Sequence, residues 1–311
     1  MASIADIWTR AVLLSGDSFY VGTSGADDMS MDATVIGLAG MAGDDTLRSG
    51  AEDSFLFGDF WSVGLFDNND PYDFSVVGND KLFGGGGEDI LVGGPGNDTL
   101  IGGSGGDVYF LVGNGPDIVI EQLNSGKDTV FSTKSSYTLT DNVENLIFAN
   151  IRTELLRNVR GTGNGLANTI QGGFGDDTLS GAGGNDVLSG SKGRDVLTGG
   201  AGSDDFAFGF RAYGTSKIST GAEADIIRDF NPAKDQIILN PGSFTTNSVI
   251  EGVIKAARFG LIGSTLTGNE LVLYDSATGN LMTSTQEVFA HVMPGTAVTY
   301  LDFEWAFYLG M

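Results

Sequence analysis

A nine-residue period governs what this chain can fold into. Three units follow one another without a break in register over 84–92, 93–101 and 102–110, and four more run over 172–207. Each unit begins with glycine, has aspartate at its sixth position and has an apolar residue at its eighth. Self-similarity at a fixed short period is the signature of a repeat architecture, in which each unit stacks on its neighbours.

The pattern resembles the nonapeptide G-G-x-G-x-D-x-U-x of the calcium-binding RTX family, where U is apolar. Seven units keep both the aspartate and the apolar position. The resemblance implies an all-β fold, a right-handed parallel β-roll in two repeat blocks with a C-terminal capping β region. Six residues of each unit would turn and three would form a strand, so that two units complete one coil of eighteen residues. The alternative is that these glycines and aspartates merely punctuate the turns of another all-β or low-complexity chain.

Aspartates eighteen positions apart should stack, because successive coils lie about 4.8 Å apart like hydrogen-bonded strands. The expected pairs are Asp80 with Asp98, Asp89 with Asp107, Asp177 with Asp195, and Asp186 with Asp204. Two carboxylates about 5 Å apart repel by roughly 3 kcal/mol at an effective dielectric near 20. A hard divalent cation that accepts carboxylate and carbonyl oxygens would turn this repulsion into attraction, which couples calcium binding to folding.

The resemblance implies that several Ca²⁺ ions are held by the turn glycines and aspartates of the repeats, with one polar residue from each weaker unit that precedes a block. The expected metal-binding residues are Asp80, Gly85, Gly87, Asp89, Gly94, Gly96, Asp98, Gly103, Gly105, Asp107, Asn168, Gly173, Gly175, Asp177, Gly184, Asp186, Gly193, Asp195, Gly200, Gly202 and Asp204. Asp45, in an isolated upstream unit, and Asn168 are left open between a ligand and a capping polar residue.

The rest of the chain is divided around these blocks. The expected segments are a degenerate repeat-like region at 1–77, a first block at 78–125, a connector at 126–162, a second block at 163–210 and a cap with a secretion signal at 211–311. Alternating apolar and Thr residues with turn signals predict ion-free strands in the connector. Its basic residues favour a solvated face over a ligand patch; they are Lys127, Lys134, Arg152, Arg157 and Arg160.

The segment 223–239 resembles the strand pair that closes the roll in the C-terminal domain of serralysin-type proteases. A cap is also expected on physical grounds, because the last coil would otherwise expose its strand edge. Asp225, Asp229 and Asp235 could bind a terminal calcium ion or cap turns. The acidic loop over 67–73 lacks the glycine of an EF-hand loop and is expected to be a plain surface turn.

Composition excludes several classes of function. The net charge of −24 opposes binding to nucleic acid and to anionic membranes. The chain has no cysteine and one histidine, His291, so zinc-hydrolase motifs cannot be built. Gly102 to Gly106 spells G-x-S-x-G around Ser104, but as a phase of the repeat rather than as a nucleophile elbow. No transmembrane segment and no ordinary cleaved signal peptide are expected, and we expect no enzymatic activity.

Relatives with this C-terminal pattern leave the cell by type I secretion through an uncleaved C-terminal signal, which implies a secreted, extracellular protein. The expected partners are calcium ions and the type I secretion machinery, together with a surface glycan or matrix in an adhesion or host-interaction role. Two alternatives stay open at this point. One is a carbohydrate-binding module like the repeat modules of alginate epimerases, with Arg152, Arg157 or Arg160 in a basic groove; the other is a degenerate protease or lipase.

Overall fold

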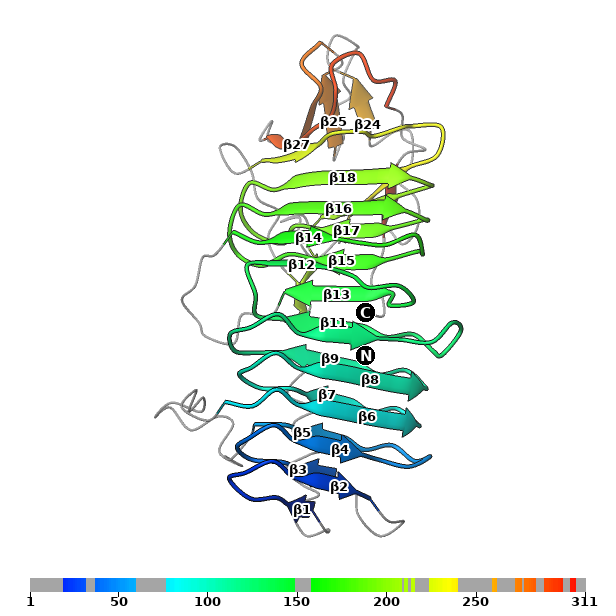
Figure 1. Cartoon of the computed structure of the whole chain (residues 1–311). Helices are drawn as coiled ribbons and strands as arrows, with labels where there is room; N and C mark the ends of the chain where they lie inside the picture. The colour runs from blue at the N-terminus through cyan, green and yellow to red at the C-terminus, as the bar shows by residue number, and fades with distance from the viewer. Residues whose placement is uncertain are drawn as a thin grey trace. The chain divides into compact units, whose positions relative to one another are not determined.

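We describe the fold from a computed structural model (Figure 1). It describes residues 19–31, 37–59, 77–148, 158–208, 210–211, 214–215, 224–239, 259–261, 272–275, 277–283, 288–298 and 303–305. In these residues the regular secondary structure consists of β-strands alone. Within the same ranges no helix is long and apolar enough to cross a membrane.

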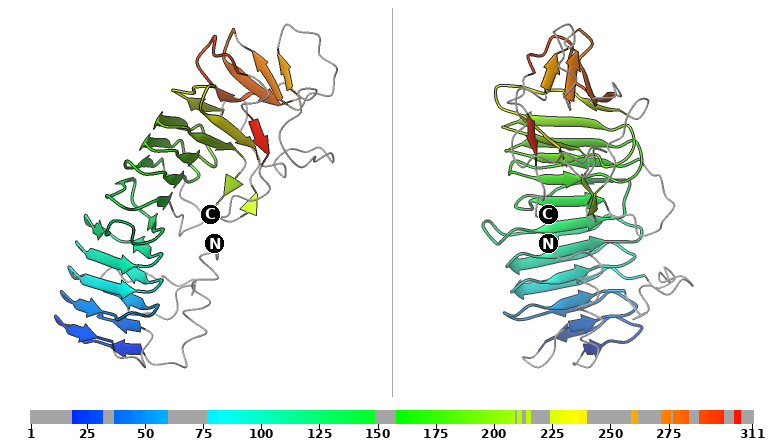
Figure 2. Two further views of the ribbon diagram at one scale, coloured as in Figure 1. Left: turned by 90° about the vertical axis from the view of Figure 1, so that its right-hand side faces the viewer. Right: turned by 180° about the vertical axis from the view of Figure 1, so that it is seen from behind.

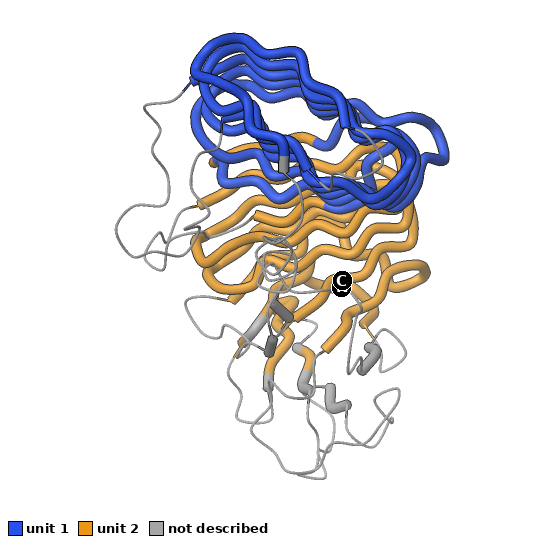
Figure 3. The backbone as a smooth tube through the Cα atoms, turned by 90° about the horizontal axis from the view of Figure 1, so that it is seen from below, with its two compact units in different colours: residues 1–134, 139–145 blue, residues 135–138, 146–311 orange. Residues whose placement is uncertain are grey.

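The chain divides into two compact units, Met1–Lys134 with Leu139–Asn145, and Ser135–Thr138 with Leu146–Met311 (Figure 3). In the first unit the strands alternate between two parallel sheets. One sheet contains, in order, β1 (Phe19–Val21), β3 (Gly37–Ala39), β5 (Phe55–Phe57), β7 (Ile90–Val92), β9 (Val108–Leu111) and β11 (Thr129–Ser132). The other contains β2 (Asp28–Ser30), β4 (Thr46–Arg48), β6 (Lys81–Gly86), β8 (Thr99–Ser104) and β10 (Ile118–Ile120).

The second unit repeats this arrangement. Its first sheet contains β13 (Asn145–Phe148), β15 (Thr169–Gln171), β17 (Val187–Ser189), β19 (Asp205–Phe208), β23 (Gln236–Leu239) and β28 (Phe303–Trp305). Its second contains β12 (Ser136–Thr138), β14 (Arg160–Thr162), β16 (Thr178–Gly183), β18 (Val196–Ala201), β22 (Asp225–Ile227), β27 (Val288–His291), β26 (Asn280–Thr283), β25 (Val272–Asp275) and β24 (Phe259–Leu261). A small hairpin joins β20 (Phe210–Arg211) to β21 (Gly214–Thr215).

The expected coil of eighteen residues is present in both blocks. Leu82 pairs with Leu100 across β6 and β8, and Leu179 pairs with Leu197 across β16 and β18. Because strands of one sheet come from alternate units of the repeat, each coil contributes one strand to each sheet. Figure 2 shows the resulting stack of strands from two further directions, and Figure 3 shows the coils of the first unit nearly superimposed. The chain therefore forms the parallel β-roll that the repeat predicts.

The core is built from the eighth residue of each unit. Leu91, Leu100 and Tyr109 in the first block are fully buried, as are Leu179, Leu188, Leu197 and Phe206 in the second. In β7 and β17 the residue at this position is fully buried and the residue before it is less buried, while the residue after it is also buried. Each such side chain contributes about 2–3 kcal/mol of burial, which is small against the cost of ordering nine residues.

The roll continues beyond the second block. β22 pairs in parallel with β18, and β23 with β19, so the segment 224–239 adds a further coil. β27 and β28 then pair with β22 and β23, and antiparallel strands β25 and β26 extend the sheet. These strands cover the edge that the second block would otherwise expose, as expected of a capping region. The specific likeness to serralysin-type domains stays a prediction.

Upstream, the degenerate units are also coils of the roll. Leu47 of β4 pairs with Leu82 of β6 in the same register that Leu82 keeps with Leu100. The acidic segment 67–73 lies outside the described residues, between β5 and β6.

Candidate metal centres

Acidic residues at the ends of the turns stack into ladders that run from coil to coil. Each ladder residue precedes or begins a strand, and the backbone N–H of one donates to a side-chain oxygen of the next at 2.7–3.2 Å. In the first unit, ladder 1 contains Asp27, Asp45, Asp80, Asp98 and Asp117, and ladder 2 contains Ser54, Asp89, Asp107, Asp128 and Glu144. In the second, ladder 3 contains Asp177, Asp195 and Asp225, and ladder 4 contains Asn168, Asp186, Asp204 and Asp235.

The four pairs of stacked aspartates expected from the spacing are all present. The Asp80 N–H donates to Asp98 Oδ1 at 2.9 Å, and the Asp186 N–H donates to Asp204 Oδ1 at 3.0 Å. The spacing predicted repulsion between the stacked carboxylates, and the structure shows that the two oxygens of each carboxylate have different surroundings. Oδ1 accepts a hydrogen bond from a backbone N–H, so Oδ2 is the oxygen that requires a cation.

Seven of the ladder aspartates have an Oδ2 atom that is buried and has no hydrogen-bond partner. They are Asp45, Asp80, Asp89, Asp98, Asp107, Asp186 and Asp195, all at most 1% exposed. Two ion pairs join described residues to one another, Arg48–Asp28 and Lys134–Asp117, and neither involves these seven. Since an isolated buried carboxylate costs several kcal/mol, so many unsatisfied anionic oxygens call for counter-cations.

A backbone carbonyl of the next coil lies beside Oδ2 of Asp80, Asp89 and Asp186. The point where a Cβ atom of residue 84 would stand is 2.5 Å from both Asp89 Oδ2 and the Gly102 carbonyl oxygen. The same pair of oxygen types flanks Gly58, Gly172 and Gly181. Carboxylate and carbonyl oxygens in one cradle are the ligands that Ca²⁺ prefers. These glycines are not among the residues predicted from the sequence; because they lack a side chain, the two oxygens are accessible to each other.

Most of the predicted glycines lie in the turns between strands, while Gly85, Gly103 and Gly200 lie near the carboxyl ends of β6, β8 and β18. Gly103, at φ +112°, and Gly105, at φ +134°, are approached by the carbonyls of Gly85 and Gly87 at the points where a Cβ would stand. These positions therefore need glycine both for the left-handed backbone and for the close approach of the previous coil. The Gly173 N–H donates to Asp177 Oδ2 at 2.6 Å, so this aspartate is satisfied within its own turn. Whether these glycines and their aspartates bind ions stays a prediction.

Burial raises the pKa of the ladder carboxyls above the ordinary value of 3.8. Desolvation is the largest cause, and it brings the pKa of Asp80 to about 8, of Asp98 and Asp107 to about 7, and of Asp89 to about 6. Neighbouring carboxylates raise the pKa of Asp80, Asp98 and Asp107 further, and backbone hydrogen bonds partly oppose the rise. Without a cation, these carboxyl groups are therefore partly protonated near neutral pH.

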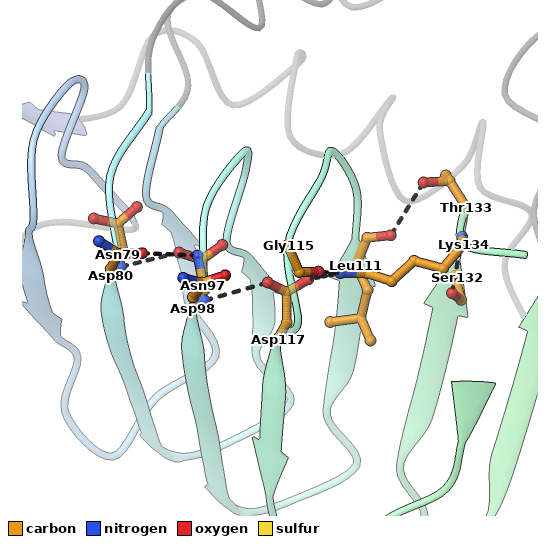
Figure 4. Close-up of polar contacts among 10 residues, drawn as sticks. All are labelled: Asn79, Asp80, Asn97, Asp98, Leu111, Gly115, Asp117, Ser132, Thr133 and Lys134. Carbon is orange, nitrogen blue, oxygen red and sulfur yellow. Dashed lines mark hydrogen bonds and ion pairs between the residues drawn. The ribbon is translucent and has the colours of Figure 1, made fainter. Parts of the chain in front are cut away.

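Ladder 1 ends in a side-chain cation (Figure 4). The Lys134 ammonium donates to the Gly115 carbonyl and lies 2.7 Å from Asp117 Oδ2. The Lys134 side chain is 18% exposed and that of Asp117 is 2% exposed, so the expectation of a solvated face is wrong for this lysine. An ammonium here meets a carboxylate and a carbonyl, the oxygen types that flank the glycine cradles. Asp117 accordingly has a charged partner, whereas Asp98, one coil earlier, has an unpartnered Oδ2.

The structure also places the aspartates whose role, ion ligand or turn cap, the sequence did not decide. Asp45, Asp225 and Asp235 are buried members of ladders 1, 3 and 4. Asp229 instead accepts hydrogen bonds from the N–H groups of Gly199 and Gly200 at 2.9 and 2.8 Å, as a turn cap does. Asp117 and Asp128, which sequence reasoning did not single out, follow shifted spacings of 19 and 21 residues. Those shifts concealed them from a search at a strict period.

The residues that the alternative functions require are placed as follows. Arg152 and Arg157 lie outside the described residues, and Arg160 is exposed on β14. Ser104 is an exposed residue at the end of β8, in a strand and turn of the repeat. His291 Nδ1 lies 2.7 Å from Asn280 Oδ1 across β26 and β27.

Comparison with known families agrees with the geometry. No curated protein matches the chain. The family model of the RTX calcium-binding nonapeptide repeat matches four copies, at residues 38–60, 76–109, 162–197 and 180–210. The matched segments contain most of the ladder residues of both units, including Asp45, which the sequence argument had left open. The matches therefore identify RTX calcium-binding nonapeptide repeats in both blocks and in the upstream units of this chain.

Proposed function

We propose that this protein binds several Ca²⁺ ions in its carboxylate ladders and that ion binding drives the folding of the roll. The observation that carries the proposal is the set of seven buried Oδ2 atoms without hydrogen-bond partners. At Gly58, Gly84, Gly172 and Gly181, the carboxylate oxygen lies beside a carbonyl of the next coil. A divalent ion between them satisfies both coils at once, so neighbouring sites fill cooperatively.

The proposed cellular role follows from the calcium concentration at which the roll folds. In calcium-poor cytosol the buried carboxylates oppose folding, which keeps the chain suited to export through a type I channel. Millimolar calcium outside the cell then orders the roll, because binding free energy is folding free energy in such sites. We propose an extracellular surface, matrix or host-interaction protein without catalytic activity, since the described roll offers shape, charge and ion-dependent order.

The decisive experiment is a circular-dichroism titration of the metal-free protein with CaCl2 at pH 7.5, followed by counting of bound ions on the same sample. We expect little β signal before calcium, a steep transition at extracellular calcium levels, and a weak response to magnesium, whose rigid octahedral geometry suits these cradles poorly. A chain with full β signal in chelator and the same melting temperature with and without calcium would refute the proposal.

A matched pair of variants tests the assigned ligands. The double change Asp186→Ala with Asp204→Ala removes two neighbouring rungs of ladder 4 and should shift the calcium midpoint upward. Asp141→Ala changes an exposed carboxylate of the connector and should leave the midpoint unchanged. Equal shifts in the two variants would mean that the ladder does not hold the ions.

A further inference from the structure

Ladder 2 changes its construction at the end of the first block. β9 and β11 pair with Val108 opposite Thr129, so this coil contains 21 residues instead of 18. The longer connection carries Glu121, which directly follows β10 and is only 8% exposed. An acidic side chain is thereby brought into the roll at a place where no nonapeptide position predicts one.

The Glu121 carboxylate lies where other coils have a backbone carbonyl. In the unit that begins at Gly84, the cradle is formed by Asp89 Oδ2 and the carbonyl oxygen of Gly102 in the following coil. In the unit that begins at Gly102, the corresponding point is flanked by Asp107 Oδ2, Glu121 Oε1 and the Tyr109 hydroxyl. A neutral ligand has thus been replaced by an anionic one, and a phenol oxygen has been added.

The cluster contains three buried carboxyl groups. One oxygen each from Asp107, Glu121 and Asp128 lies within 4.8 Å of the others. Asp107 and Asp128 are fully buried, and the Asp107 N–H donates to Asp128 Oδ1 at 2.7 Å. The Ser125 hydroxyl lies 3.0 Å from Glu121 Oε2 and so holds the glutamate in place.

The Asp107 Oδ2 atom is the observation that points to a ligand at this cluster. It is buried without a hydrogen-bond partner and points to the cradle that Glu121 Oε1 also faces. The Tyr109 hydroxyl donates to Glu121 Oε1 and provides no positive charge. Neither ion pair of the described residues reaches the cluster.

We propose that Asp107, Glu121 and Asp128, with the Tyr109 hydroxyl beside them, form a metal site of a different kind from the repeat sites. With three carboxylates instead of carboxylates and carbonyls, it binds Ca²⁺ more tightly than the repeat sites and binds trivalent lanthanides more tightly still, since affinity for hard cations rises with ligand charge. The site fills first and orders the end of the first block at calcium levels below the main transition.

Tyr109 provides a direct test, because a tyrosine beside bound Tb³⁺ transfers its excitation to the ion. The full-length protein is titrated with TbCl3 under excitation near the tyrosine band, and each bound equivalent is counted by calorimetry. We expect the first equivalent to produce most of the sensitised emission. Glu121→Gln keeps the shape of the side chain but removes its charge, and should weaken this first equivalent by roughly ten-fold or more.

Two further variants separate the possible outcomes. Asp98→Asn alters ladder 1 and should leave the first equivalent and its emission unchanged. Tyr109→Phe keeps all three carboxylates and should lose most of the emission while the affinity changes by no more than about three-fold. Tyr109→Phe also decides the matter if Glu121→Gln fails to fold in saturating calcium, because emission equal to that of the unmodified protein would overturn the proposal.

The result also distinguishes this inference from the proposed function. A protein that binds neither Ca²⁺ nor Tb³⁺ would refute both. A protein that binds several calcium ions, but whose first Tb³⁺ equivalent is the same in Glu121→Gln, would refute only the additional site.

Discussion

The raised pKa values of the ladder carboxyls predict an unusual response of the metal-free protein to pH. Burial brings the pKa of Asp98 from 3.8 to about 7 and that of Asp80 to about 8. The folded state therefore holds protons that the unfolded chain releases above pH 4. Stability is fully present below that pH and is lost as pH rises toward 8, opposite to a protein whose carboxylates form salt bridges.

The size of the effect follows from the shifts. A rise of about three pKa units, as for Asp98, corresponds to roughly 4 kcal/mol of stability lost between pH 4 and pH 8. Asp107 has a shift of the same size, and that of Asp80 is larger. A few such groups together match the 5–15 kcal/mol that holds a typical domain together. We therefore expect the metal-free roll to be folded near pH 4.5 and largely unfolded at pH 7.5.

The assay is circular dichroism with urea unfolding in metal-free buffers from pH 4.5 to pH 8, repeated with 10 mM CaCl2. Calcium should restore the fold at pH 7.5, because the ion replaces the protons on Oδ2. Asp80→Asn should reduce the pH slope in metal-free buffer by about one proton, whereas Asp141→Asn, at an exposed position, should not. Equal or greater metal-free stability at pH 7.5 than at pH 4.5 would refute the reasoning.

Three further substitutions have defined outcomes. Gly84→Ala places a methyl group between a carboxylate and a carbonyl, so calorimetry should show at least one calcium ion fewer, whereas Gly50→Ala, with open space around it, should bind the full number. Leu100→Ala should lower the free energy of unfolding in saturating calcium by about 2–5 kcal/mol, against less than about 0.5 for the exposed Leu123→Ala. Lys134→Met leaves a buried carboxylate without its partner, so the calcium-loaded protein should bind one ion more; an unchanged ion count would contradict the view that this ammonium replaces a metal.

The sequence was sufficient for the roll because its period encodes the coil directly. Asp89 and Leu91 belong to one unit, and the eighteen-residue spacing fixes both the stacked acid and the buried apolar partner in the next coil. Glu121 and Lys134 were beyond the reach of this reasoning. Both lie where the period is broken, and only the paired strands show which turn each side chain enters. The hydrogen bond that satisfies Oδ1 also depends on backbone geometry that spacing alone does not give.

The connection between β5 and β6 has a consequence for how such proteins diversify. Asp45 and Asp80 are separated by 35 residues, yet their hydrogen bond, at 2.8 Å, matches the one between Asp80 and Asp98, which are 18 apart. Pairing between strands, rather than the amount of intervening chain, sets the distance between rungs. A roll of this kind can therefore acquire a whole extra segment at one turn, and with it a new surface, while the ion-binding scaffold on either side keeps its dimensions.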